Sequence, residues 1–165
     1  MTTHVALTAR AFNASGLVLA DVKDKKLEQT INKLVSDWGG SFFLKMGVPW
    51  RSVIEDWKAK GRTVVQLTAY GENIQESNVM ERIRSLQKDI IVIVGSQKVP
   101  DEFFSREVTD YNVAVGNQPH SECSSLAVFL DRFFEGQALS KTFENAKIEI
   151  IPQKHGKRAI RHSNP

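Results

Sequence analysis

The chain has 165 residues, of which 41% are hydrophobic and 25% are charged, so it is long enough to bury a substantial core. No apolar run approaches the roughly 20 residues that a membrane-spanning helix needs, and the N-terminus lacks the basic and apolar segments of a signal peptide. One cysteine cannot form an intrachain disulfide, which suits a reducing compartment. These features favour a single cytoplasmic domain without a membrane segment.

The net charge is only +3, but the C-terminal tail is strongly basic. Between Gln153 and Pro165 it contains Lys154, Lys157, Arg158 and Arg161 and no acidic residue. A basic patch on a nearly neutral body favours a phosphate-rich partner, although a tail that only improves solubility has the same composition. Both interpretations stay open on charge alone.

The first half of the chain alternates between helical and extended patterns. Apolar residues with helical spacing predict three helices, of which the first has Thr2 or Thr3 as a potential cap. The predicted helices are Thr2 to Ala14, Asp24 to Trp38, and Pro49 to Gly61. Short apolar runs between them predict strands. The predicted strands are Leu17 to Ala20, Ser41 to Met46, and Thr63 to Leu67.

The second half continues the alternation. Asp89 to Val94 is apolar throughout, which predicts a central strand covered on both faces. The other predicted elements are helices at Ile74 to Gln87, Pro100 to Ser105 and Ser124 to Glu135, and a strand at Tyr111 to Val115. Lys147 to Ile151 and Arg158 to Arg161 flank a His155-Gly156 turn and predict a β-hairpin. We therefore expect one domain, with residues 1–146 as its body and residues 147–165 as a hairpin and basic tail.

This alternation predicts an α/β fold with a mostly parallel sheet and helices on both faces. Ligands bind such sheets at the carboxyl ends of the strands. Three strand ends carry glycine-containing loops: Leu67 to Gly71, Gly95 to Pro100, and Gly116 to Glu122. Their exposed backbone groups suit a purine and a ribose, whereas the motifs of dinucleotide-binding and P-loop proteins are absent.

Other chemistry is weakly supported. His120 and Glu122 lack a third ligand at suitable spacing, so we expect no metal. Cys123 is interpreted as a small buried residue rather than a nucleophile. Ser121, His120 and Asp110 contain the residue types of a catalytic triad, but no nucleophile-elbow motif accompanies them.

Several stretches together resemble the SPOUT class of RNA methyltransferases. They are Val92 to Pro100, Asp110 to Glu122, and Ala127 to Arg132. More narrowly, the chain resembles the archaeal tRNA ribose 2′-O-methyltransferases that act on cytidine 56 of the T-loop. Thr3 to Phe12, Trp38 to Phe43, and Leu67 to Gly71 share this resemblance. Members of that family usually carry a strand and a basic segment before the first of these stretches.

The resemblance implies methyl transfer from S-adenosylmethionine to a tRNA ribose, a homodimer and a C-terminal trefoil knot. For such a reaction our candidate catalytic residues are Arg10 and Asn117, although Arg10 is equally consistent with a surface or ion-paired arginine. The candidate RNA-binding residues are Arg10 and, from the charge of the tail, Lys154, Lys157, Arg158 and Arg161. The implied cofactor-binding residues are Leu67, Gly95, Ser96, Gln97, Lys98, Val99, Val115, Gly116, Asn117, Gln118, Pro119, His120, Ser121 and Glu122. Two rival hypotheses are a catalytically impaired RNA-binding dimer that binds the cofactor without transfer and a small nucleotide-binding regulatory domain.

Overall fold

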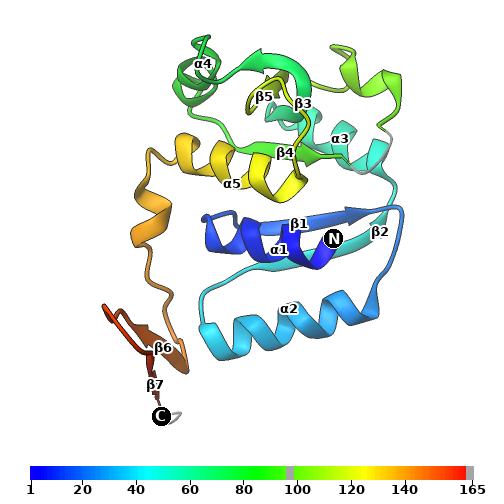
Figure 1. The fold of residues 1–165 in the computed structure, drawn as a ribbon. Coiled ribbons are helices and arrows are strands. Elements are labelled where there is room, and N and C mark those ends of the chain that lie inside the picture. Colours follow the sequence, from blue (N-terminus) through cyan, green and yellow to red (C-terminus); the bar gives the residue numbers. More distant parts are fainter. Residues whose placement is uncertain (96–98, 163–165) are drawn as a thin grey trace.

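The computed structural model describes residues 1–95 and 99–162 (Figure 1). The helices are α1 (Thr2–Ala11), α2 (Lys25–Trp38), α3 (Trp50–Ala59), α4 (Val79–Ser85) and α5 (Glu122–Phe133), with 3-10 helices η1 (Asp101–Phe104) and η2 (Gln137–Ser140). The strands are β1 (Gly16–Ala20), β2 (Phe43–Val48), β3 (Thr63–Asn73), β4 (Ile90–Val94), β5 (Tyr111–Ala114), β6 (Ile148–Ile151) and β7 (Arg158–Arg161). None of the helices among the described residues has the length and hydropathy that a transmembrane helix requires.

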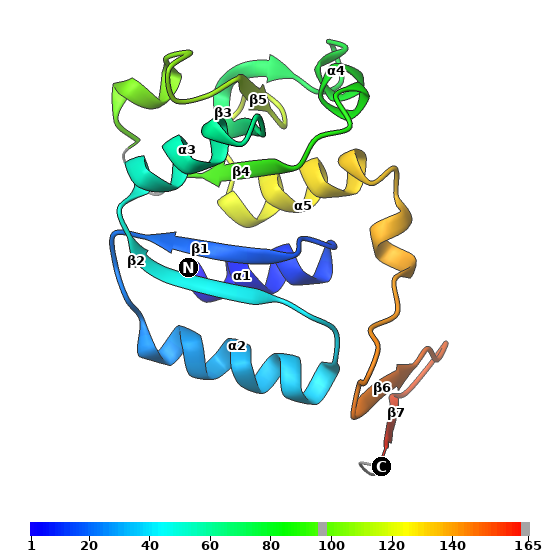
Figure 2. The same ribbon diagram turned by 180° about the vertical axis from the view of Figure 1, so that it is seen from behind.

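The strands form three sheets. β1 and β2 pair in parallel, and β3 lies between β4 and β5 in a second parallel sheet. The arrows of β1 and β4 point the same way in Figures 1 and 2, so the two parallel sheets share a common direction. The expected α/β class and parallel strands are confirmed, whereas the single expected sheet is divided in two.

Helices cover both faces of the three-stranded sheet. On one face, Val65, Leu67 and Val113 pack in the same core as residues of α5, and this core extends to α1 and α2. On the other face, Val64 packs with Ile54 of α3 and with Phe103 of η1. Successive strand residues point to opposite faces, which places Val64 and Val65 in different cores. The prediction of helices on both faces is therefore confirmed.

The prediction that Asp89 to Val94 forms a central strand is wrong. Among the described residues, β4 pairs only with β3, so it lies at the edge of its sheet. Its apolar side chains correctly indicate contacts on both faces, because Ile90 and Val92 pack against one core and Ile91 and Ile93 against the other. An apolar run indicates that both faces of a strand are covered, but it does not indicate how many strands are hydrogen-bonded to its edges.

Several predicted boundaries also change. α1 has Met1 at its N-cap position without a side-chain cap, so neither Thr2 nor Thr3 caps it. α4 begins at Val79 because Asn73 to Asn78 form a turn, in which the Ser77 N–H donates to the Asn73 carbonyl at 3.0 Å. β3 continues to Asn73, beyond the predicted loop at Leu67. The Asp24 side chain caps α2 as a helix-start pattern predicts, accepting from the Leu27 N–H at 3.0 Å.

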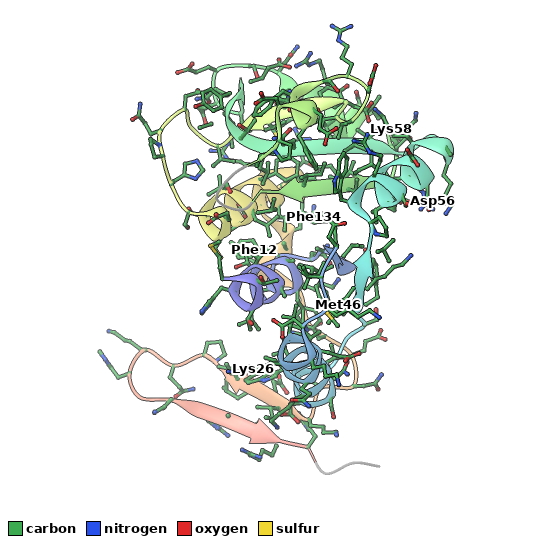
Figure 3. All side chains as sticks on the ribbon, turned by 90° about the vertical axis from the view of Figure 1, so that its right-hand side faces the viewer. Phe12, Lys26, Met46, Asp56, Lys58 and Phe134 are labelled. Atoms are coloured by element: carbon green, nitrogen blue, oxygen red, sulfur yellow. The ribbon has the colours of Figure 1, made fainter. Side chains whose placement is uncertain are left out.

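The predicted C-terminal hairpin is confirmed. β6 and β7 are antiparallel, with Ile148 opposite Arg161. The hairpin lies beside α2 and reaches away from the parallel sheets (Figures 1 and 3). The Lys147 N–H donates to the Asp37 carbonyl at 3.0 Å, which ties the start of the hairpin to the end of α2. The description of residues 147–165 as an appendage of the same domain stays a prediction.

Candidate functional site

The three predicted loops meet at one edge of the β4-β3-β5 sheet. Leu67 is in register with Val94 of β4 and Val113 of β5, so the ends of β4 and β5 lie on either side of the point where β3 leaves its regular pairing. Leu67 is 8% exposed, and Gly95 and Val115 are half-buried. Ser96, Gln97 and Lys98 of the predicted site lie outside the described residues. The structure thus brings the rest of the predicted ligand loops together.

Gly116 leaves open space in the loop after β5. Its φ is +82°, a backbone conformation that favours glycine, and a Cβ built on it would meet no atom within 4 Å. Gln118, Pro119 and His120, which follow in the same loop, are exposed. The loop therefore offers bare backbone and free volume, which a bound ligand can occupy.

The loop ends at the capped start of α5. The Ser121 hydroxyl accepts from the Ser124 N–H at 3.3 Å, and Glu122 lies in the first turn. Cys123 is only partly buried, so the prediction of a buried cysteine is met in part. The unpaired N–H groups at a helix start carry a partial positive charge, which favours a carboxylate or phosphate.

Asn117 joins the Gly116 loop to β3. Its side-chain NH₂ donates to the carbonyls of Ala69 and Gly71, at 2.8 and 3.3 Å. Its side-chain oxygen accepts from the Asn73 amide at 2.9 Å. Both ends of the Asn117 amide are therefore engaged by the chain itself. This geometry supports a role in holding two loops together rather than in touching the reacting atoms.

Residues Thr68 to Gly71 bulge out of β3. Leu67 and Glu72 are both opposite Val113 of β5, so the four residues between them have no partner on that strand. In this bulge the side chain of Tyr70 is 88% exposed to solvent. Gly71 is required for its close approach to β5, because a Cβ there would lie 2.5 Å from the Asn112 and Val113 backbone. Bulges of this kind often redirect side chains next to active sites.

Gln66 is a second feature that the sequence patterns did not single out. It is 1% exposed, and neither end of its amide has a hydrogen-bond partner among the described residues. A buried amide without a partner costs about 1–3 kcal/mol. Its neighbours Val65 and Leu67 belong to the apolar core. Because Gln66 lies within an apolar run, the sequence pattern gives no sign that its amide is buried without a partner.

Arg10 lies far from these loops. It is near the end of α1 that leads into the start of β1, whereas the loops lie at the ends of the parallel strands (Figure 1). Its guanidinium donates to the carbonyls of Trp38 and Gly39, at 3.0 and 2.7 Å, and stacks on Phe143 at 4.2 Å. Arg10 is 8% exposed, and this burial lowers its pKa. The geometry favours a structural clamp over contact with a substrate.

The predicted RNA-binding residues of the hairpin are exposed. Lys154, Lys157, Arg158 and Arg161 form no ion pair with the residues that the structure describes. Four unpaired cations on one hairpin are available to a polyanion.

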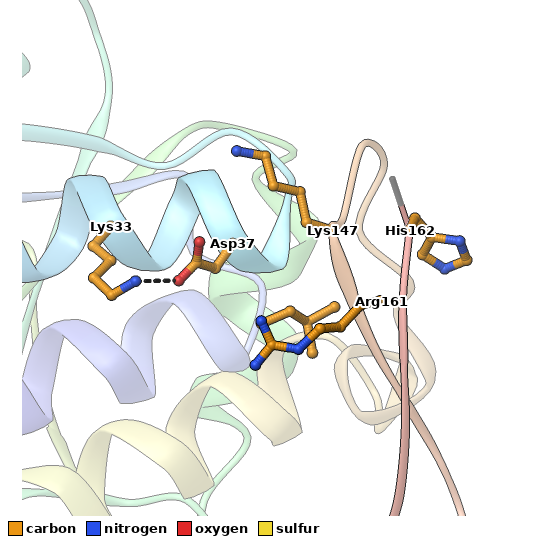
Figure 4. Close-up of a pocket in the computed structure, with 6 residues that line it drawn as sticks. Lys33, Asp37, Lys147, Arg161 and His162 are labelled. Atoms are coloured by element: carbon orange, nitrogen blue, oxygen red, sulfur yellow. Dashed lines mark hydrogen bonds and ion pairs between the residues drawn. The ribbon is translucent and has the colours of Figure 1, made fainter. Parts of the chain in front are cut away.

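A cavity of about 290 Å³ lies where the hairpin meets α2 (Figure 4). Its walls include Lys33, Asp37, Lys147 and Arg161. The hydrogen bond from Lys33 lowers the pKa of Asp37, and the positive charges of Lys147 and Arg161 lower it further. The Lys33–Asp37 pair is 2.7 Å long and leaves the positive charges of Lys147 and Arg161 in excess. This surface suits an anion better than an apolar ligand.

Comparison with known proteins decides the family. Residues 38–160 match the family described as tRNA ribose 2′-O-methyltransferase, aTrm56. The chain is 50% identical over 163 residues to the tRNA (cytidine(56)-2′-O)-methyltransferase of Methanocaldococcus jannaschii, covering 98% of this chain and 88% of that relative. It is 49% identical to the protein of the same name from Staphylothermus marinus, covering 96% of this chain and 83% of that relative.

The chain belongs to the aTrm56 family. Its fold is also that of solved methyltransferase structures. One is the SpoU methyltransferase AviRb from Streptomyces viridochromogenes in complex with AdoMet, with a TM-score of 0.57 and 15% identity, covering 82% of this chain and 52% of that chain. Another is an RNA 2′-O ribose methyltransferase, with a TM-score of 0.58 and 16% identity, covering 82% of this chain and 51% of that one. The chain thus spans about half the length of these structures, which show its fold alone. The trefoil knot stays a prediction from the resemblance.

Proposed function

We propose that the chain transfers a methyl group from S-adenosylmethionine to the ribose 2′-hydroxyl of cytidine 56 in tRNA. The similarity to relatives of that activity carries this proposal, because it extends over 98% of the chain at 50% identity. A tRNA substrate accounts for the unpaired cations of the hairpin. The same proposal includes that the protein acts as a homodimer in the cytoplasm and holds no resident metal.

The described residues fit the proposed cofactor. Leu67 is in register with Val94 and Val113, and Gly95 and the loop from Val115 to Glu122 follow those two strands, which supports a binding site at this edge of the sheet. The open space at Gly116 allows close approach of a ligand to backbone N–H and C=O groups. The N–H groups at the start of α5 suit the methionine carboxylate of S-adenosylmethionine. This edge therefore offers backbone groups that suit the adenosine of the cofactor and N–H groups that suit its carboxylate.

The bound cofactor would supply a methyl group activated on a sulfonium, and the neutral thioether that leaves needs no acid. The acceptor 2′-hydroxyl would release its proton to solvent water as it takes the methyl group. The chain then has to hold the acceptor hydroxyl in line and exclude other geometries, which makes positioning its main contribution. Asn117 serves this purpose by fixing the Gly116 loop against the Ala69 and Gly71 carbonyls. Arg10 keeps its charge even with a lowered pKa and is a poor proton acceptor.

The proposal is tested by incubating the protein with labelled S-adenosylmethionine and an unmodified tRNA transcript. We expect one methyl group per tRNA, located on the ribose of nucleotide 56. A transcript with 2′-deoxycytidine at that position is the control and should stay unlabelled. Binding of both S-adenosylmethionine and tRNA without transfer would instead identify the impaired RNA-binding dimer.

Removing the charges of the hairpin is expected to weaken tRNA binding. Replacing Lys154, Lys157 and Arg158 together by glutamine should make tRNA binding less sensitive to salt. The negative slope of log K against log salt concentration should become shallower by about 2 to 3. These side chains are exposed, so cofactor affinity and thermal stability should stay unchanged. The measurement is a tRNA-binding titration at several salt concentrations.

A matched control removes three exposed lysines elsewhere, Lys25, Lys26 and Lys88. It changes the net charge equally, and we expect a much smaller change in salt slope. Equal slopes for the two triple variants would show that the hairpin contacts no phosphate and that its charges serve solubility.

A further inference from the structure

Tyr70 and Phe104 form an exposed aromatic pair beside the proposed cofactor pocket. Tyr70 is 88% exposed and Phe104 is 39% exposed. Their ring centroids are 6.1 Å apart and the rings meet edge to face. Tyr70 comes from the bulge of β3 and Phe104 from η1, so tertiary structure brings the two rings together.

Both rings stand on rigid supports. The Tyr70 bulge is held by Asn117, which binds the carbonyls on either side of Tyr70. Phe104 follows Phe103, which is 9% exposed and lies 4.4 Å from the Trp50 ring. A fixed aromatic surface loses little conformational entropy when a flat ligand stacks on it. The backbone that carries Tyr70 and the residue before Phe104 are therefore held in place before any partner binds, while the Tyr70 ring itself is 88% exposed.

The position of the pair limits what can reach it. Asn117 belongs to the proposed cofactor loop and donates to the carbonyls of both neighbours of Tyr70, so the backbone that carries the ring adjoins that loop. The base of a nucleotide is bonded directly to its ribose. A nucleotide that presents its 2′-hydroxyl to this pocket therefore brings its base next to the bulge.

Two acidic side chains near the bulge are paired with arginines, whereas Asp101 of η1 is exposed and forms no ion pair with the described residues. Glu102 of η1 pairs with Arg51 at 2.6 Å, and Glu72 pairs with Arg82. These pairs reduce the repulsion that a phosphate backbone would meet at the bulge. The exposed rings of Tyr70 and Phe104 offer a stacking surface among these charged side chains, and proteins recognise unpaired bases largely by stacking them on such rings.

We propose that the base of the target nucleotide stacks on Tyr70, with Phe104 supporting the ring from its edge. This inference rests on the proposed function and adds a means of recognition to it. The 2′-hydroxyl is the same in every nucleotide, so the methyl acceptor alone does not distinguish one ribose from another. A stacked base selects a nucleotide that has left its helix or loop pairing.

The experiment compares Tyr70→Ala, Tyr70→Phe and Leu139→Ala with the wild-type protein. Leu139 is 68% exposed on η2 and serves as a matched control away from the bulge. We expect Tyr70→Ala to lower kcat/KM for tRNA about tenfold or more, in line with the loss of one stacked base. Tyr70→Phe and Leu139→Ala should stay within about twofold of wild type, and so should the S-adenosylmethionine Kd of every variant.

A second substrate separates stacking from a structural role. With an abasic nucleotide at the target position, Tyr70→Ala should cause no further loss, because the base that it would stack is gone. An equal loss on both substrates, or no loss on normal tRNA, overturns the proposal while leaving the methyltransferase function intact. A wild-type protein that transfers no methyl group to normal tRNA overturns both.

Discussion

Replacing Gly116 by alanine is expected to remove most of the S-adenosylmethionine affinity while leaving the protein folded. The new methyl group would occupy space that contains no protein atom within 4 Å, so it meets no steric clash in the folded chain and adds only the strain of the positive φ. Forcing an extra methyl group into a well-fitted contact costs about 1–3 kcal/mol, which corresponds to roughly tenfold to hundredfold weaker binding. Calorimetric titration with S-adenosylmethionine measures this change directly.

The control for this prediction is Gly136→Ala. Gly136 follows α5, has a φ of +76° and also lacks any atom within 4 Å of a built Cβ. Both alanines adopt the same unfavourable backbone conformation, at a cost of about 1–2 kcal/mol in stability. Both variants should thus melt at similar temperatures, and only Gly116→Ala should lose the cofactor. Wild-type affinity in Gly116→Ala would mean that the ligand does not approach this loop.

The sequence predicted the site better where its signals are local. Glycine after an apolar run marks a strand that ends, whereas the helix predicted from Ser124 begins at Glu122 because Ser121 caps it. Parallel strands then bring such ends together without further information. For this reason the edge formed by Leu67, Gly95 and Gly116 follows from the sequence and from the predicted fold class.

Features that depend on contacts between residues far apart in the chain could not be predicted from local sequence patterns. Thr68 to Gly71 has the composition of a turn, yet it is a bulge because β3 pairs again with β5 at Glu72. That pairing depends on the fit of Gly71 against the Asn112 and Val113 backbone, about which local propensity says nothing. The exposure of Tyr70 is a consequence of the same long-range pairing and was missed with it.

The role of the candidate catalytic residue Arg10 could not be predicted from local sequence either. On a predicted amphipathic helix, an isolated arginine suits a phosphate contact and a structural bond equally well. The carbonyls that it binds belong to Trp38 and Gly39, and the ring beneath it belongs to Phe143. Only the packing of three separate segments distinguishes the two roles.

Arg10→Ala is accordingly expected to reduce stability far more than it changes catalysis by the folded protein. The substitution leaves the Trp38 and Gly39 carbonyls without their donor and removes the stacking on Phe143. The loss should be about 2–4 kcal/mol, or roughly 5 to 15 °C in Tm for a chain of this size. Thermal unfolding measures it, and kcat at a temperature where the variant is folded should stay within about threefold of wild type, since the guanidinium lies away from the reacting groups.

Arg51→Ala provides the matched control, because Arg51 also stacks on an aromatic ring, that of Trp50 at 4.6 Å. The Arg51 side chain is 58% exposed and its ion pair with Glu102 lies on the surface, so its loss should cost less than about 1 kcal/mol. In Arg10→Lys, the ammonium retains a charge and donors but not the planar fork, so stability should fall between wild type and Arg10→Ala. An Arg10→Ala protein with wild-type Tm and no methyl transfer would contradict the clamp and restore Arg10 to the reaction, because stability and catalysis would then respond in the opposite order.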